Sequence, residues 1–322
     1  MREASALDVL QVRIGSASGE LQLSSIMTIL GDPRLLSFGS VGLVYQVTDD
    51  IAVKRAFADD NEGIHNEYRI YDVLDSMPHC PNLVRSFYRI PSANFLQYLS
   101  GGTVDQRLRQ HQIRDPSNDR VTRVTKSEPK SLIWRWMAEL ADAIAWLESL
   151  GYVHGDIRPP NLLLDGNDHL KVVDFDNTTK AGSEFDGCQP PYARVLSNED
   201  ADERGTFGCH GPRTEQFAIG SVFYYMTRGF EPYDNEWLGR KHGNEVVNLL
   251  QEKKFPKLND KDMDIIIHNC WHGKYESIKR LKIEVIRLGR NIRLSMATAM
   301  SKEEYEARRQ ECRRLVDTSR SE

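Results

Sequence analysis

The alternation of apolar and polar positions predicts a first region that is rich in strands. Residues 36–57, LSFGSVGLVYQVTDDIAVKRAF, predict two strands of β-branched and aromatic residues joined by the turn TDD. Residues 61–76 carry apolar side chains at spacings of three and four, which predicts a helix. Two more strand-like runs, LVRSFYRI and NFLQYL, follow a break that contains prolines. We therefore expect a small lobe of strands with one main helix.

The pattern after Gly102 is mainly helical. Residues 131–150 predict an amphipathic helix, and Gly151 stands where a glycine often ends a helix. Residues 162–175 predict a hairpin around the turn DGND. Of the remaining segments, 114–130 is predicted as an exposed loop, 177–213 as a long loop, 215–228 as a buried helix, and the rest to about residue 316 as helical. This part is expected to form a larger lobe.

Composition narrows the class of protein. The 322 residues are 40% hydrophobic and 28% charged, as in ordinary globular proteins, and the chain is longer than most single cores. The net charge of -5 argues against nucleic acid as the main partner. Five widely spaced cysteines without a CxxC pair predict reduced thiols and a cytoplasmic or nuclear protein that is not secreted. The N-terminus lacks the features of a signal peptide, and no apolar run is long enough for a membrane helix, so no membrane partner is expected.

The stretch HGDIRPPN, residues 154–161, gathers several reactive groups in a short segment. Asp156 is able to accept a proton, Arg158 to hold anionic oxygens, and Asn161 to offer an oxygen to a metal ion. The same residue types are common in exposed turns. The stretch alone therefore fits a catalytic loop or a polar turn.

A second acid favours the catalytic interpretation. Asp174 ends an apolar strand, where an unpaired carboxylate would be costly to desolvate. A divalent cation would remove that cost, and Mg²⁺ prefers oxygen ligands of which the protein supplies one or two. The predicted hairpin brings Asn161 and Asp174 together, which suggests a magnesium site. The alternative is that Asp174 only caps a turn.

A third feature lies upstream, in the predicted strands. Gly39 and Gly42 stand in a strand-turn-strand context, where glycine lets the backbone approach a phosphate closely. Lys54, after three apolar residues on the next strand, supplies a point charge for phosphates. Glu67 on the following helix offers that lysine a partner. Each signal is weak alone, and their order along the chain carries the weight.

In this order, the motifs resemble those of a divergent eukaryotic-type protein kinase, similar to stand-alone kinase-like proteins common in fungi. The resemblance covers residues 35–285. It implies an α+β, two-lobed protein kinase-like fold, with a small strand-rich N-lobe (35–100) and a larger, mainly helical C-lobe (101–285). Residues 1–34 form an N-terminal extension and residues 286–322 a helical C-terminal one. The sequence leaves open whether LDVLQVRI adds a strand to the small lobe, and whether the C-terminal helices pack on the large lobe or extend away.

The resemblance implies ATP and Mg²⁺ as cofactors and a role for each matching residue. Asp156 would orient the substrate hydroxyl and accept its proton, and Arg158 would stabilise the transferring phosphoryl group. Asn161 and Asp174 would hold Mg²⁺. Lys54 would contact the α- and β-phosphates and pair with Glu67. The nucleotide would also be contacted by Gly39, Gly42, Val44, Ala52, Leu96 as gatekeeper, the backbone of Gln97 and Leu99, and Leu163.

Several departures from the family pattern bear on regulation. Gly155 replaces the arginine of H-R-D, so control by phosphorylation of the activation loop is not implied. Asp176 replaces the glycine of D-F-G, and because a non-glycine residue resists positive φ, we expect the flip to an inactive arrangement to be harder. PPYARVL, residues 190–196, is the nearest stretch to A-P-E. Glu215 resembles the acid that anchors the catalytic loop.

The expected function is transfer of the γ-phosphate of Mg-ATP to a protein hydroxyl, with serine or threonine favoured by the family alone. The protein substrate is not identified by the sequence, nor is the oligomeric state. One alternative is a pseudokinase or nucleotide-binding scaffold with a degenerate activation segment. Another is a phosphotransferase that acts on a small molecule, because function follows the site rather than the fold.

Overall fold

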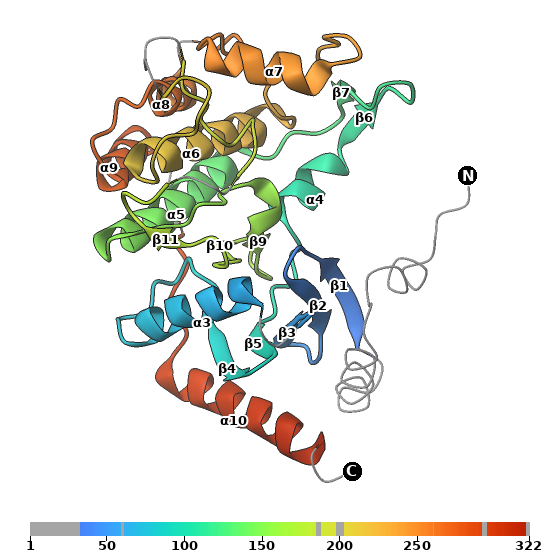
Figure 1. The fold of residues 1–322 in the computed structure, drawn as a ribbon, viewed down its shortest axis with the longest axis vertical. Helices are drawn as coiled ribbons and strands as arrows, with labels where there is room; N and C mark the ends of the chain where they lie inside the picture. The colour runs from blue at the N-terminus through green and yellow to red at the C-terminus, as the bar shows by residue number, and fades with distance from the viewer. Residues whose placement is uncertain are drawn as a thin grey trace. The chain divides into compact units, whose positions relative to one another are not determined.

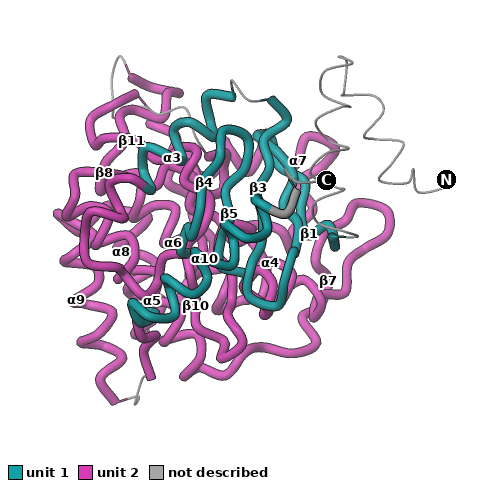
Figure 2. The backbone as a smooth tube through the Cα atoms, turned by 90° about the horizontal axis from the view of Figure 1, so that it is seen from below, with its two compact units in different colours: residues 1–71, 85–98, 300–322 teal, residues 72–84, 99–299 magenta. Residues whose placement is uncertain are grey.

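The computed structural model describes residues 33–58, 61–184, 188–197, 203–259, 261–291 and 295–319. The chain divides into two compact units, in agreement with the two lobes predicted from the sequence. The first comprises residues 1–71, 85–98 and 300–322, and the second residues 72–84 and 99–299 (Figure 2). The strand considered for LDVLQVRI lies outside the described residues.

The first unit is built on a five-stranded antiparallel sheet. Its order is β1-β2-β3-β5-β4, formed by Arg34–Phe38, Gly42–Gln46, Ile51–Ala56, Ala93–Gln97 and Ser86–Ile90. The helix predicted for 61–76 is α3, Glu62–Asp75. Residues 36–57 were expected to form two strands, but they belong to three, because the chain turns back at 39–41 and the Gly39 N–H donates to the Gly42 carbonyl at 2.9 Å. The small strand-rich lobe with one main helix is confirmed.

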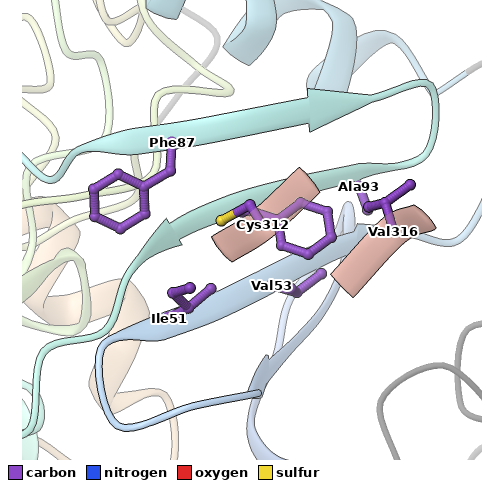
Figure 3. Close-up of a cluster of buried hydrophobic side chains, with 7 residues drawn as sticks. Ile51, Val53, Phe87, Ala93, Cys312 and Val316 are labelled. Carbon is purple, nitrogen blue, oxygen red and sulfur yellow. The ribbon is translucent and has the colours of Figure 1, made fainter. Parts of the chain in front are cut away.

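The two faces of this sheet carry different side chains. Successive residues of a strand point to opposite faces, so Ile51 and Val53 on β3 lie on the face opposite to Lys54. Ile51 and Val53 pack in an apolar cluster whose other fully or nearly buried members are Phe87, Ala93, Phe95, Cys312 and Val316 (Figure 3). Lys54 instead meets Glu67 of α3. The outer face is thus apolar, whereas the inner face includes a buried ion pair.

The C-terminal helix α10, Lys302–Ser319, covers the outer face (Figure 1). Cys312 and Val316 enter the apolar cluster, and the Tyr305 ring lies 5.9 Å from that of Phe87. The Tyr305 hydroxyl donates to the Ser86 carbonyl at 3.3 Å. The sequence left the place of this helix open between the large lobe and solvent. The structure makes it part of the first unit, where its apolar residues pack against strands that lie far from it in the sequence.

The second unit is mainly helical. Its helix α5 packs against α9, and α6 packs against α8. The elements are α4 (Val104–Arg109), β6 (Gln112–Arg114), β7 (Val121–Val124), α5 (Lys130–Ser149), β8 (Tyr152–Val153), the 3₁₀ turn Pro159–Asn161, β9 (Leu162–Leu164), β10 (Leu170–Val172), β11 (Thr179–Lys180), α6 (Pro212–Arg228), α7 (His242–Gln251), α8 (Asp262–Trp271) and α9 (Ile278–Leu288). The exposed loop predicted for 114–130 is wrong in part, because β6 and β7 pair as a short hairpin.

Two elements position the segment 154–161. The long helix α5 ends as predicted, with Gly151 in the left-handed conformation at φ +80° and its N–H bonded to the Glu148 carbonyl. The short strand β8 then pairs with β11, inside the segment 177–213 that was expected to be a loop. The predicted hairpin is present as β9 and β10.

Across the described residues, no helix combines the length and the apolar character that a membrane crossing requires.

Candidate functional site

The inner face of the sheet brings together Lys54, Val44, Ala52 and Leu96, four of the residues that the sequence assigned to nucleotide binding. The register pairs Val44 with Lys54, and Ala52 with Leu96. Residues directly opposite each other share a face, and Ala52 and Lys54 share one because they are two apart. Val44 and Leu96 are half-buried. One face therefore presents a lysine and partly open apolar side chains.

The Lys54 ammonium and the Glu67 carboxylate form a buried ion pair. Lys54 Nζ lies 2.6 Å from Glu67 Oε2, and the Glu67 side chain is 1% exposed. Removing one partner of such a pair leaves a buried charge without compensation. The pairing predicted from sequence is present, and it fixes the ammonium above the inner face.

The structural need for glycine differs between the two glycines of the β1–β2 turn. A Cβ at Gly42 would lie 1.8 Å from the Arg55 carbonyl oxygen, so the close pairing of β2 with β3 requires glycine there. A Cβ at Gly39 would meet only ordinary contact, at 3.6 Å from the Gly42 oxygen. Gly42 is explained by the sheet itself. Gly39 is not, and its role in approaching a phosphate stays a prediction.

The segment after β5 has one backbone group already committed. The Gln97 N–H donates to the Arg85 carbonyl at 2.9 Å. A backbone contact of Gln97 with a base must therefore use its carbonyl. Leu99 is buried and belongs to the second unit, as does the half-buried Leu163 of β9. Their predicted contacts with adenine stay predictions.

In the second unit, the catalytic-loop candidate is anchored by Glu215. The Glu215 carboxylate is buried at the start of α6 and accepts the N–H of His154 at 2.8 Å and that of Gly155 at 3.2 Å. Burial raises the pKa of Glu215, and the interaction with His154 and the two N–H donors oppose that rise. The anchoring role that the resemblance assigned to Glu215 matches these contacts.

His154 is a structural residue that the sequence did not single out. Its Nδ1 accepts the Asp156 N–H at 3.2 Å, so Nε2 carries the proton and donates to the Val173 carbonyl at 3.0 Å. Its ring also lies edge-on to that of Phe175, at 5.6 Å between centroids. His154 therefore joins the catalytic-loop candidate to the strand that leads to Asp174. No periodicity in the sequence signals such a contact, because it links segments about twenty residues apart.

Asp156 is surrounded by donors. Arg158 Nε donates to Asp156 Oδ2 at 3.0 Å, and Asn161 Nδ2 donates to the same oxygen at 2.7 Å. Burial alone would lower the pKa of Arg158, but the negative charge of Asp156 raises it, so the guanidinium stays cationic. The structure thus brings Asp156, Arg158 and Asn161 into one cluster. It holds a carboxylate of defined orientation beside a permanent positive charge.

Cys188 is a second residue that the sequence did not single out. Its backbone N–H donates to the Gly155 carbonyl at 3.2 Å, and its side chain is buried. Burial and the neighbouring charge of Asp156 both raise the pKa of Cys188, so the group remains a neutral thiol. A buried cysteine in a long polar segment gave no signal in the sequence that it would lie against Asp156.

Asp174 adopts an uncommon backbone conformation. Its φ is +70°, in the left-handed region that Asp tolerates better than bulky residues. The strain falls on Asp174 and not on Asp176, so the aspartate at the position of the D-F-G glycine costs nothing in this conformation. Asp176 Oδ1 accepts from Asn177 Nδ2 at 2.9 Å. The expected resistance to a flip stays a prediction.

The residues present fit a magnesium ion. Asn161 Nδ2 donates to both the carbonyl and the carboxylate of Asp156, which leaves the amide oxygen directed away from Asp156 and available as a metal ligand. The Val173 N–H donates to the Asn161 carbonyl at 3.1 Å and so ties the residue before Asp174 to Asn161. In the described part of the chain, no group of three or more His, Cys, Asp or Glu side chains is placed to hold a metal. Phosphates and water would have to complete the coordination.

Comparisons with known proteins agree with this geometry. Residues 33–305 match the model of the protein kinase domain family. A citron rho-interacting kinase of Rattus norvegicus is 29% identical over 164 residues, which cover 47% of this chain and 8% of that protein. The serine/threonine-protein kinase MRCK gamma of Mus musculus is 32% identical over 136 residues, covering 40% of this chain and 8% of that protein. A probable protein kinase of Dictyostelium discoideum is 28% identical over 163 residues, covering 48% and 42%.

The similarity therefore spans a small part of the citron and MRCK kinases and less than half of the Dictyostelium protein. The match to the family model is much more extensive, since it takes in both units and all of the predicted site residues. With the Lys54–Glu67 pair on the sheet and Asp156, Asn161 and Asp174 in the second unit, the chain belongs to the protein kinase family.

Proposed function

We propose that this protein is an ATP-dependent protein kinase that transfers the γ-phosphate of Mg-ATP to a serine or threonine hydroxyl. The observation that carries the proposal is the Asp156 cluster. One carboxylate is held by Asn161 and Arg158 at hydrogen-bond distance, in a loop anchored by a buried glutamate. Positioning and charge stabilisation are what phosphoryl transfer demands of a protein. The preference for serine or threonine rests on the names of relatives such as MRCK gamma.

The residues of the first unit would bind and orient the nucleotide. Lys54, fixed by Glu67, would hold the α- and β-phosphates as a point charge. Val44, Ala52 and Leu96 would contact the base on the inner face. Gly39 and Gly42 would cover the phosphates, and the Gln97 carbonyl would accept from the adenine edge, with Leu99 and Leu163 completing the contacts.

The residues of the second unit would act on the acceptor. Asp156 would orient the hydroxyl and take its proton as the hydroxyl oxygen forms its bond to the γ-phosphorus, while the bond from that phosphorus to the bridging oxygen breaks and ADP leaves. Arg158, which stays cationic, would stabilise the charge on the phosphoryl group. Asn161 and Asp174 would hold Mg²⁺, which when bound supplies charge neutralisation at the phosphates. We further infer that the protein acts in the cytoplasm or nucleus on a protein substrate.

Label transfer tests the proposal. The purified chain is incubated with γ-labelled ATP, Mg²⁺ and a generic basic protein, beside the Asp156→Asn variant. We expect label on serine or threonine with the unaltered chain, and a loss of at least about 100-fold in the variant. Equal labelling by both proteins would contradict the role of Asp156. A rise in melting temperature with nucleotide but no label on protein or on a panel of small hydroxylated acceptors would favour a binding module.

A further inference from the structure

Asn94 is a polar residue in the interior of the first unit that no step above uses. It lies on β5, opposite Lys54 of β3, and its exposed fraction is 0%. Burying an amide is unfavourable unless its donors and acceptors find partners. Its cross-strand pairing with Lys54 places it on the inner face. The surroundings of Asn94 should therefore show what the amide does there.

A chain of hydrogen bonds runs through Asn94 to Glu67. Asn94 Nδ2 donates to Glu67 Oε1 at 2.9 Å, and the Ser86 hydroxyl donates to Asn94 Oδ1 at 2.7 Å. Arg89 Nη1 donates to the Ser86 hydroxyl at 3.0 Å. An ionised carboxylate only accepts, so the amide nitrogen must face Glu67, and the direction of every bond in the chain is then set. Bonds aligned in one direction polarise each other and strengthen the last one.

The two oxygens of Glu67 consequently have two different donors. Lys54 Nζ takes Oε2 at 2.6 Å, and Asn94 takes Oε1. With Lys54 as the only donor to Glu67, one carboxylate oxygen would lack a partner, and the plane of the carboxylate would not be fixed. With both donors, the plane of the carboxylate is fixed, and so is the place where the ammonium sits. The sheet, and not only the helix, then determines the position of Lys54.

We propose that Asn94 is a positioning residue for the reaction. It holds the Glu67 carboxylate in the orientation that keeps Lys54 in place for the nucleotide phosphates, with Ser86 and Arg89 orienting the amide in turn. The proposal rests on the proposed function in one respect, namely that Lys54 contacts the phosphates. It goes beyond that function by assigning a role to a strand residue that touches neither nucleotide nor acceptor.

Binding of ADP to the full chain is the test, because ADP carries the two phosphates that Lys54 would contact and requires no phosphate transfer. Asn94→Leu has a similar size and removes the donor, so we expect about tenfold weaker binding by calorimetry, the value of one hydrogen bond to a charged group. Val53→Ala is the matched control on the neighbouring strand. It makes a cavity on the outer face, and it should lower the melting temperature while ADP affinity stays within about twofold.

Asn94→Asp supplies a readout that a merely structural role would not give. Its carboxylate would lie against Glu67, and two carboxylates that share a site hold one proton with a raised pKa, so the pair loses that proton only as the pH rises. ADP binding should be weak at about pH 8 and approach that of the unaltered chain at about pH 6, where a shared proton restores the donor. Asn94→Leu should show no such recovery.

The outcomes separate the two proposals. Near-normal ADP affinity in Asn94→Leu, with a fall in melting temperature like that of Val53→Ala, would overturn the positioning role. A chain that binds no ADP at all would overturn it as well. If ADP affinity depends on Asn94 as expected but no phosphate is transferred to any acceptor, the positioning role stands and the proposed kinase activity fails.

Discussion

Two buried glutamates, Glu67 in the first unit and Glu215 in the second, support the candidate site in different ways. Glu67 faces a cation and an amide, through Lys54 and Asn94. Within the described segments, Glu215 accepts from two backbone N–H groups, those of His154 and Gly155. Glu67 fixes a side-chain cation, and Glu215 fixes the path of a loop. A buried acid can therefore position either a charged side chain or the backbone of a loop. We expect substitutions of the two glutamates to have different effects.

The largest effect is expected from removing the cation that pairs with Glu67. Lys54→Met should lower phosphate transfer by about 100-fold or more. It should also lower the free energy of unfolding by about 3–5 kcal/mol, because it leaves a buried carboxylate without its cation. Denaturant unfolding and label transfer measure the two effects.

The double variant Lys54→Met/Glu67→Gln separates charge from function. With both charges gone, most of the lost stability should return, since a neutral pair carries no uncompensated charge. Activity should stay as low as in the single variant. A single variant as stable as the unaltered chain would show that the pair is not buried in solution as it is here.

The Glu215 side is tested by Glu215→Gln. The two N–H groups bond different oxygens of the carboxylate, and the amide replaces one of these oxygens with an NH2 group that cannot accept. We therefore expect a loss of about 1–3 kcal/mol in stability and about tenfold in kcat. Glu148→Gln is the matched control. Its carboxylate also accepts two backbone N–H groups, from Ile278 at 2.8 Å and Lys279 at 3.1 Å, but it anchors α9. It should lose stability and keep kcat; an equal fall in kcat would point to a general effect of loosened packing.

The loop that Glu215 holds offers a sharper probe at Gly155. Its φ is +80°, and a Cβ there would lie 2.7 Å from the Asn177 carbonyl oxygen. Gly155→Ala should cost about 1–3 kcal/mol through strain and overlap. Gly151 has the same φ but nothing within 4 Å of an added Cβ, so Gly151→Ala should cost about 1–2 kcal/mol from the backbone alone. Equal melting temperatures for the two variants would remove the argument that close packing excludes a side chain from position 155.

The smallest expected effect is a dependence on pH. Because burial raises the folded-state pKa of Glu215 above its ordinary value, its contribution to stability is fully present below the unfolded pKa and is lost as pH rises through the folded pKa. The stability of the unaltered chain relative to Glu215→Gln should therefore fall as pH rises through this window. Unfolding of both proteins at a series of pH values measures it. A difference that grows with pH would show that the N–H donors outweigh burial.

Much of this arrangement follows from the sequence, and the reason is local. The catalytic-loop candidate lies between a periodic helix and a hairpin with a clear turn signal, so Asp156, Asn161 and Asp174 could be identified together. Lys54 and Glu67 could be paired because a strand and a helix follow each other directly. These are short-range relations that motif order captures.

The rest depends on contacts between distant segments. Asn94 lies in a strand-like run that offers no hint of its bond to Glu67, twenty-seven positions earlier. Cys312 reaches the sheet only because α10 returns to the first unit. The hairpin β6–β7 was missed because its strands are only three and four residues long, too short to show a clear alternation of apolar and polar residues. Sequence periodicity shows which face of a helix or strand is buried, but it does not show which other element covers that face.

The most direct test of the account is phosphate transfer measured against ATP concentration in the unaltered chain, Glu67→Gln and Glu215→Gln. One titration gives kcat and KM for each protein. We expect transfer by the unaltered chain, a raised KM for ATP in Glu67→Gln because Lys54 is no longer fixed, and a lowered kcat with little change in KM in Glu215→Gln. No transfer by the unaltered chain, or the same change of both parameters in the two variants, would contradict these expectations.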